Sequence, residues 1–155
     1  MQIRFAKMED IPAMIRLLKQ VGRVHYEGRP DLFRADAQKY DEKALALLLQ
    51  DKNRPILVAE AEGAVMGYAF CVLQNTENDP VLQSHLTVYI DDLCVEEDCR
   101  GTGVGKALYQ AVLDYAKQLG AYNVTLNVWA ENKSALKFYE KMGLQPQKYG
   151  MEIVL

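Results

Sequence analysis

Apolar residues recur along the chain at two different spacings, and the spacing separates predicted helices from predicted strands. A repeat of three and four residues predicts four helices: Glu9–Val21, Glu42–Leu49, Val104–Leu119 and Asn132–Met142. Their ends carry the expected capping residues, with Asp41 and Asn132 as N-caps and Gly120 and Gly143 as helix stops.

Shorter runs rich in β-branched and aromatic residues predict strands. These are Gln2–Ala6, Pro55–Glu60, Val65–Leu73, His85–Val95, Tyr122–Val128, Leu144–Gln147 and Lys148–Leu155. Glu62 and Gly63 lie between the second and third runs and signal a hairpin. The segment His25–Phe33 contains Gly28 and Pro30, so it is predicted to be an irregular connector.

The order of these elements is β-α-α-β-β-β-α-β-α-β-β, without a repeat or a linker. Three antiparallel strands followed by a β-α-β crossover predict an α+β fold, a mixed sheet with helices on both faces. The chain has 155 residues and is 50% hydrophobic, so one domain is expected over residues 1–155.

Composition and charge exclude several classes of function. A net charge of -3 without a basic block argues against nucleic-acid binding. The odd number of cysteines and the absence of a Cys-x-x-Cys pair predict neither a disulfide framework nor a metal site. No apolar run is long enough to span a membrane, so a soluble, cytoplasmic protein is expected.

A glycine-rich segment joins a predicted strand to the clearest predicted helix. It reads Arg100, Gly101, Thr102, Gly103, Val104, Gly105 and Lys106. Glycines allow close approach of the backbone, and the free N–H groups at a helix start favour anions such as phosphate. A nucleotide-hydrolysing loop would need Gly at position 100 and Ser or Thr at position 107, and a dinucleotide fold would need an acidic residue about 20 positions later. The chain has Arg100 and Ala107, and no acid follows at that distance, so both are disfavoured.

This segment and its surroundings resemble the GNAT acetyltransferases. The pyrophosphate loop of that family has the pattern Arg/Gln-x-x-Gly-x-Gly/Ala, matched here by Arg100-x-x-Gly103-x-Gly105. The strand Tyr89–Val95 is similar to the fourth strand of the family. The segment Asn132–Leu144 is similar to its second cofactor motif. The resemblance covers Tyr89 to Leu144 strongly, and the N-terminal third fits in pattern only.

The resemblance implies an acetyl-CoA site without a metal. Backbone N–H groups from Gly101 to Lys106 would hold the pyrophosphate, with Asn132 near the thioester and Tyr139 facing the sulfur. The pantetheine would pair, like an added strand, with the backbone of Leu93, Cys94 and Val95. The acetyl group would pass directly to an amine, which is either a small molecule or a protein amine.

Proton transfer gives the candidate catalytic residues. The phenol of Tyr139 suits a proton donor to the leaving thiolate, because its reference pKa of about 10 exceeds the value of about 8.5 for a thiol. Asp91 and Asp92 are adjacent, so on a regular strand their side chains point to opposite faces. At most one would face the acceptor, and a bulge could change which one. Their sequence context resembles diamine acetyltransferases, which favours Asp91 as general base. In the alternative interpretation, both carboxylates only attract a cationic substrate or pair with surface cations.

Three alternatives remain open from the sequence. A non-catalytic acyl-CoA-binding module would keep the glycine loop without needing Tyr139, and a phosphate-binding fold with unrelated ligands would bind a nucleotide instead. Cys94 as a nucleophile is a lesser alternative, and His25 is expected near the acceptor site.

The apolar ending Met151–Leu155 predicts a homodimer through an exchanged or paired edge strand, or else an ordinary internal strand.

Overall fold

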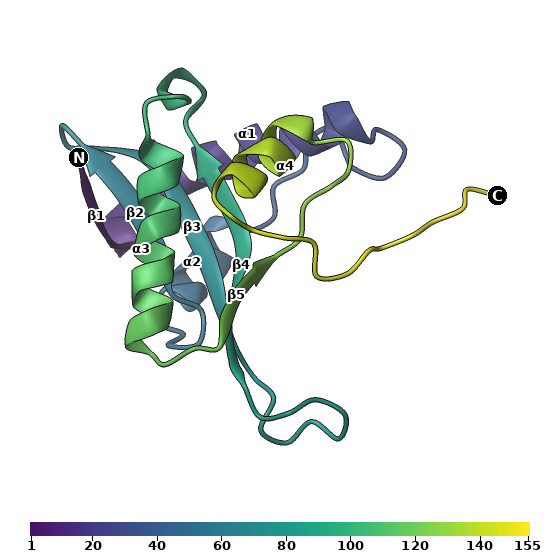
Figure 1. The fold of residues 1–155 in the computed structure, drawn as a ribbon. Coiled ribbons are helices and arrows are strands. Elements are labelled where there is room, and N and C mark those ends of the chain that lie inside the picture. Colours follow the sequence, from purple (N-terminus) through teal and green to yellow (C-terminus); the bar gives the residue numbers. More distant parts are fainter.

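The computed structural model describes residues 1–155. Its five strands form one sheet in the order β1-β2-β3-β4-β5 (Figure 1). The strands are β1 (Gln2–Phe5), β2 (Ile56–Ala61), β3 (Ala64–Asn75), β4 (Leu86–Val95) and β5 (Asn123–Leu126). Neighbouring strands are antiparallel except β4 and β5, which run parallel. The mixed sheet expected from the sequence is therefore confirmed.

Helices cover both faces of this sheet. They are α1 (Ile11–Gly28), α2 (Glu42–Leu48), α3 (Val104–Gln118) and α4 (Lys133–Lys141). Short 3-10 turns at Met8–Asp10 and Glu97–Cys99 precede α1 and the glycine segment. The α3 helix is the crossover that the parallel pairing of β4 and β5 requires. None of these helices combines the length and the apolar character that a membrane crossing demands.

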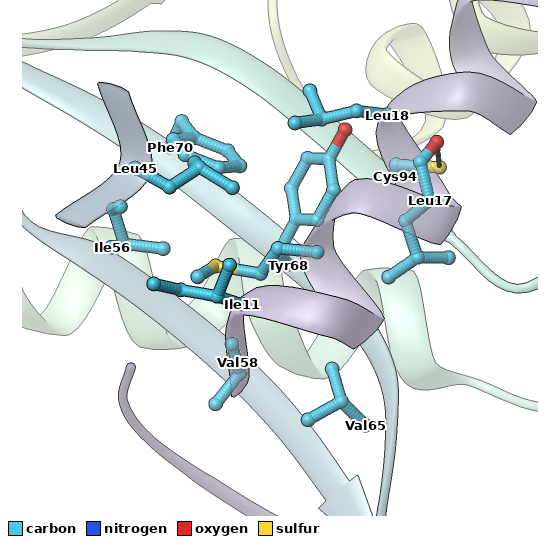
Figure 2. Packing of buried hydrophobic residues seen from close by; sticks show 11 residues of the cluster. Ile11, Leu17, Leu18, Leu45, Ile56, Val58, Val65, Tyr68, Phe70 and Cys94 are labelled. Atoms are coloured by element: carbon cyan, nitrogen blue, oxygen red, sulfur yellow. Dashed lines mark hydrogen bonds between the residues drawn. The ribbon is translucent and has the colours of Figure 1, made fainter. Parts of the chain in front are cut away.

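The sheet separates two buried clusters. The first lies under α1 and α2, where the ring of Tyr68 is fully buried among aliphatic side chains (Figure 2). It comprises Ile11, Met14, Leu17, Leu18, Leu45, Ile56, Val58, Val65, Tyr68, Phe70 and Cys94. The second lies under α3 and comprises Leu57, Ala59, Ala69, Cys71, Val88, Ile90, Val104, Leu108, Tyr109, Val112 and Ala116. Because strand side chains alternate, one sheet supplies both clusters.

The local signals in the sequence form the expected turns and caps. Glu62 and Gly63 both have positive φ, 52° and 77°, as a two-residue hairpin loop requires. The carboxylate of Asp41 accepts a hydrogen bond from the Ala44 N–H at 2.7 Å. The Asn132 side chain accepts one from the Ala135 N–H at 3.1 Å. The hairpin and both predicted N-caps are confirmed.

Two expectations from the sequence are wrong. The segment from His25 to Gly28 is not part of a connector but the last turn of α1, which ends where the Arg29 N–H bonds the His25 carbonyl at 2.9 Å. Val21 and Val24 continue the apolar stripe of the helix, and Pro30 follows its end. The terminal strands predicted over Leu144–Gln147 and Lys148–Leu155 are absent, because no strand of this chain pairs with them.

Candidate active site

The glycine segment forms a turn that leaves several N–H groups without an acceptor. Gly101 and Gly103 have φ values of 77° and 94°, which L side chains rarely adopt, and Gly103 is the N-cap of α3. The first N–H of this helix to reach a carbonyl is that of Ala107, 3.0 Å from the Gly103 oxygen. The N–H groups of residues 103–106 donate to no atom of the chain. They can therefore donate to an anion.

The β4 strand has an open edge beside this turn. It pairs with β5 only from Thr87 to Ile90, whereas its pairing with β3 continues to Val95. The backbone from Asp91 to Val95 thus has a strand on one side only. A methyl group at Gly105 would lie 3.5 Å from Val95 and from the ring of Phe138, so the end of β4, the start of α3 and the middle of α4 meet here.

A β-bulge places two carboxylates on one face of β4. Phe70 pairs with Asp92 and Cys71 with Ile90, so Asp91 is the extra residue. Ile90 and Leu93 both pack against the second cluster under α3. The two aspartates between them point to the opposite face, toward α1 and α2. On a regular strand the two side chains would point to opposite faces, whereas the bulge directs both to the same face.

The two carboxylates have different partners. Asp91 forms an ion pair with the Lys39 Nζ at 2.8 Å and accepts a hydrogen bond from the Tyr40 hydroxyl at 2.9 Å. Asp92 accepts a hydrogen bond from the Tyr68 hydroxyl at 2.7 Å. Burial raises the pKa of Asp92 to about 6, against the lowering effect of the Tyr68 hydroxyl. Asp92 is therefore a carboxylate that titrates close to neutral pH.

The α4 helix places Tyr139 near this pair of carboxylates. Its hydroxyl makes no hydrogen bond within the chain, and its side chain is half-buried. Burial raises the pKa of Tyr139, and the negative charge of Asp92 raises it further. The phenol thus stays protonated well above neutral pH. Burial also raises the pKa of the Cys94 thiol to about 12, which disfavours that residue as a nucleophile.

Asn132 lies in a pocket at the start of α4. Its side-chain oxygen is occupied by the N-cap bond, and the pocket is shared with residues of α1 and the following connector. The His25 and Phe33 rings stack with centroids 4.9 Å apart, and Phe33 meets Trp129 edge-on at 5.2 Å. Arg29 completes this wall. His25, expected near the acceptor site, thus lines a pocket that borders α4.

The remaining predicted site residues surround the same turn. Arg100, Thr102 and Lys106 are exposed, Val104 is buried in the second cluster, and Thr102 donates to the Cys99 carbonyl at 2.6 Å. Leu93, Cys94 and Val95 form the open edge of β4.

No local motif in the sequence points to Tyr68, Tyr40 or Lys39 as site residues. Lys39 and Tyr40, in the segment before α2, hold Asp91, and Tyr68 of β3 holds Asp92, so only the fold brings these residues together.

Comparisons with known proteins agree with this arrangement. The profile of the Acetyltransferase (GNAT) family matches residues 19–144. The uncharacterized N-acetyltransferase YhfO of Bacillus subtilis is 33% identical over 148 residues, which are 94% of this chain and 90% of that protein. The uncharacterized N-acetyltransferase MJ1207 of Methanocaldococcus jannaschii is 33% identical over 104 residues, 65% of this chain. The aligned part is only 43% of that longer relative.

Solved structures share the whole fold. A mutant of the BH1408 protein of Bacillus halodurans superposes with a TM-score of 0.95 at 33% identity, covering 100% of this chain and 99% of its own. The aminoglycoside N-acetyltransferase AAC(6')-Iy, solved in complex with CoA, has a TM-score of 0.73 at 18% identity and shows the same fold. It covers 99% of this chain and 98% of its own. With a family profile that spans most of its length and a relative that matches it nearly end to end, this chain belongs to the GNAT acetyltransferase family.

Proposed function

We propose that this chain is an acetyl-CoA-dependent N-acetyltransferase that acts as one domain and transfers the acetyl group to a primary amine by direct attack. One observation carries the proposal. The glycine turn with its free N–H groups, the open edge of β4 and the hydroxyl of Tyr139 all lie around the junction of β4, α3 and α4. An anion site, an extended slot and a proton donor in this order suit coenzyme A and its thioester.

The residues at the turn fit a diphosphate. Nothing lies within 4 Å of the point where a Cβ would sit at Gly101 or Gly103, so the turn has open space above it. The N–H groups of residues 103–106 point out of the start of a 15-residue helix, whose dipole favours negative charge. Arg100 and Lys106 are exposed nearby and add positive charge. The backbone of Leu93–Val95 would pair with the pantetheine amides, with Asn132 at the far side of the slot.

Asp92 is the general base in this proposal. An alkyl amine has a pKa of about 10.4, so it arrives as an ammonium ion and must lose a proton before it attacks. Burial raises the pKa of Asp92 to about 6, so Asp92 is ionised at neutral pH and accepts a proton more readily than an ordinary carboxylate does. Asp91 is already held by Lys39 and Tyr40, so its role is to attract the cation. This assignment reverses the preference for Asp91 that the sequence context suggested.

Tyr139 is the general acid. Bound acetyl-CoA supplies a thioester carbonyl whose sulfur leaves as a thiolate and needs a proton. Tyr139 keeps its proton at neutral pH because burial raises its pKa, and its hydroxyl has no competing acceptor in the chain. The N–H of Val95 at the open edge is placed to donate to an oxyanion. The amine is a small molecule or a protein amine, and a homodimer in the cytoplasm is the expected context.

Tyr139→Phe tests the proposal. Turnover of an acetylated amine falls about 100-fold or more, the affinity for acetyl-CoA is unchanged, and the defect becomes smaller at high pH, where the thiolate leaves without help. A panel of amines with detection of released thiol gives the rates, and calorimetry gives the affinity. Binding of acetyl-CoA with no turnover of any amine would favour the non-catalytic binding module. Equal turnover of both proteins across pH would remove Tyr139 from the mechanism.

A matched pair of variants tests the base. In the wild-type protein, kcat at saturating acceptor rises through a pH of about 6 as Asp92 ionises. Asp92→Asn abolishes this limb and lowers kcat about 100-fold, whereas Asp91→Asn keeps the limb and mainly raises KM for the amine. The opposite pattern would assign the base to Asp91.

Gly103→Asp tests the anion site. A carboxylate at this N-cap would repel the diphosphate and strain a residue with a φ of 94°. Affinity for CoA drops, while affinity measured side by side for ATP and NAD stays low in both proteins. Unchanged affinity for CoA would show that the diphosphate binds elsewhere, and tight binding of a nucleotide instead would favour an unrelated ligand.

A further inference from the structure

Two polar side chains are buried in this chain, and one of them has no part in the proposed mechanism. They are Asp10, which pairs with Arg4, and Gln20 of α1, which is 9% exposed. A buried amide costs free energy unless its donors and its acceptor are bonded. The hydrogen bonds of the Gln20 side chain all go to the end of β4 and to the turn that follows it. Gln20 therefore joins α1 to the cofactor side of the proposed site.

The Gln20 amide holds three positions within four residues. Its Nε2 donates to the Val95 carbonyl at 3.0 Å and to the Cys94 Sγ at 3.5 Å. Its Oε1 accepts a hydrogen bond from the Glu97 N–H at 3.2 Å. The Cys94 thiol lies beside Leu17 of α1 (Figure 2) and donates to the Leu17 carbonyl at 3.6 Å. The end of β4, which has lost its pairing with β5, is thus fixed to α1 instead.

The bond to Val95 fixes the open edge of β4. The Glu96 N–H donates to the Met66 carbonyl at 2.8 Å, so the backbone of Glu96 faces β3. Successive residues of an antiparallel pair face opposite sides, so the N–H and the C=O of Val95 both point toward the open edge. Gln20 holds the carbonyl, and the N–H remains available. Because both groups belong to one residue, a bond that fixes the carbonyl also fixes the direction of the N–H.

The bond to Glu97 fixes the start of the path to the glycine turn. Glu97 is the first residue of the 3-10 turn Glu97–Cys99, which leads directly into Arg100. A helical turn leaves its first N–H groups unpaired, and the N-cap residue Glu96 supplies no side-chain bond. The Gln20 oxygen accepts from one of these N–H groups. One amide therefore holds both the proposed oxyanion donor and the entry to the anion site.

The other polar contacts between α1 and this segment are exposed ion pairs. Arg16 pairs with Glu96 at 2.8 Å, and Arg23 pairs with Glu97 at 3.3 Å. The Arg23 and Glu97 side chains are 59% and 61% exposed, so water screens their attraction and the pair contributes little. Gln20 is thus the buried member of this row on α1.

We propose that Gln20 is a positioning residue for acetyl transfer. It aims the Val95 N–H at the developing oxyanion and fixes where that N–H lies relative to the glycine turn, so that one cofactor can use both. This inference rests on the proposed function. A donor that stabilises an oxyanion must be in place before the charge develops, and a small displacement lowers the rate strongly.

Gln20→Met tests this role, because methionine has a similar length and makes neither bond. The value of kcat falls about 10-fold or more, and the Kd for CoA, measured by calorimetry, rises about 3-fold. Arg23→Gln is the matched control, since it removes only the exposed ion pair between the same helix and the same turn. It leaves kcat and Kd unchanged. A lower urea midpoint of Gln20→Met with unchanged kcat and Kd would show that Gln20 only stabilises the fold, and would overturn the proposal.

Gln20→Glu separates the two bonds and serves if Gln20→Met does not fold. The new carboxylate still accepts from the Glu97 N–H but cannot donate to the Val95 carbonyl. The Kd for CoA therefore stays near the wild-type value, while kcat relative to wild type falls about 10-fold at high pH and recovers as the carboxyl gains a proton that it can donate. A ratio of the two kcat values that does not change with pH would contradict the role of this bond.

Failure of the proposed function has a different signature. A wild-type chain that binds CoA but acetylates no amine would remove the enzyme, whichever residue stands at position 20. The calorimetric comparison would still decide the link between Gln20 and the glycine turn, because an unchanged Kd for CoA in Gln20→Met would overturn it.

Discussion

Every buried residue lies between Asp10 and Ala116, whereas β5, α4 and the terminal segment contain none. The first part holds both core clusters and most of the sheet. The second part supplies Asn132, Tyr139 and the apolar ending, which carry much of the proposed function. The scaffold is therefore stabilised by its own core. We expect the functional part to gain order from the cofactor that it is proposed to bind.

Leu108→Ala and Leu136→Ala make the same change in the two parts, so their effects on the free energy of unfolding can be compared directly. Leu108 is fully buried, and a methyl group at Gly67 would lie 3.1 Å from it, so the cavity cannot easily collapse. Its truncation lowers the free energy of unfolding by about 2–5 kcal/mol. Leu136 in α4 is half-buried, and its truncation costs about 1 kcal/mol or less. Urea unfolding measures both values, and equal losses of unfolding free energy would contradict the difference between the two parts.

Coenzyme A is expected to stabilise the glycine turn and α4 more than the rest of the chain. At a concentration of about 100 times its Kd, a ligand that binds only the folded state adds about 2.7 kcal/mol to the free energy of unfolding. We expect the largest gain in hydrogen-exchange protection at residues 101–106 and in α4 (Lys133–Lys141), with little change in α1. Protection that rises first in the cluster under α1 would contradict this division.

The sequence predicts most of the helices and strands but not all of them. Apart from the last turn of α1, the elements up to the end of α4 follow from periodicity and capping residues. Two terminal strands are also expected from the sequence, but the partner strand that each would need cannot be identified from its own residues. Periodicity specifies which face is apolar and leaves open which edge receives it.

The candidate site shows a similar limit. The glycine turn, Asn132 and Tyr139 come from local motifs. The structure brings the turn and Tyr139 to one junction, whereas Asn132 lies in the pocket at the start of α4. The environment of Asp91 and Asp92 could not be predicted, since it depends on a bulge opposite Phe70 and Cys71. The hydroxyls of Tyr40 and Tyr68 reach the aspartates from segments 51 and 24 residues away. Such pairings are properties of the fold.

Asp10→Asn tests the ionic contribution to the first part. The Arg4 guanidinium, through its hydrogen bonds to Asp10, holds the pKa of that carboxyl below its usual range. Arg4 also pairs with Glu60 at 2.6 Å, so the cluster joins β1, β2 and the start of α1. At pH 7 the variant loses about 2 kcal/mol of unfolding free energy.

The pH dependence of this loss gives its sign. A carboxyl whose native pKa is depressed stabilises the protein above its unfolded pKa of about 3.9, and this stability disappears as the pH falls through the native value. The difference between wild type and Asp10→Asn should therefore shrink in acid. A difference that stays constant between pH 7 and pH 3 would mean that packing, and not charge, is responsible.

Gly120→Ala and Gly143→Ala give the smallest effect and the most closely matched test. Both glycines follow a helix with positive φ, 69° after α3 and 94° after α4, and nothing lies within 4 Å of the added methyl at either site. The capping bonds also correspond: Ala121 N–H to the Ala116 carbonyl at 2.9 Å, and Leu144 N–H to the Tyr139 carbonyl at 3.1 Å. Each alanine therefore costs about 1 kcal/mol of local strain and little else.

After α3, that strain lowers the global free energy of unfolding, because α3 is part of the core. After α4, it leaves the urea midpoint unchanged and appears as faster amide exchange in α4 and a higher KM for acetyl-CoA. Equal shifts of the midpoint in both variants would show that α4 unfolds together with the core, and the separation of scaffold from functional part would then fail.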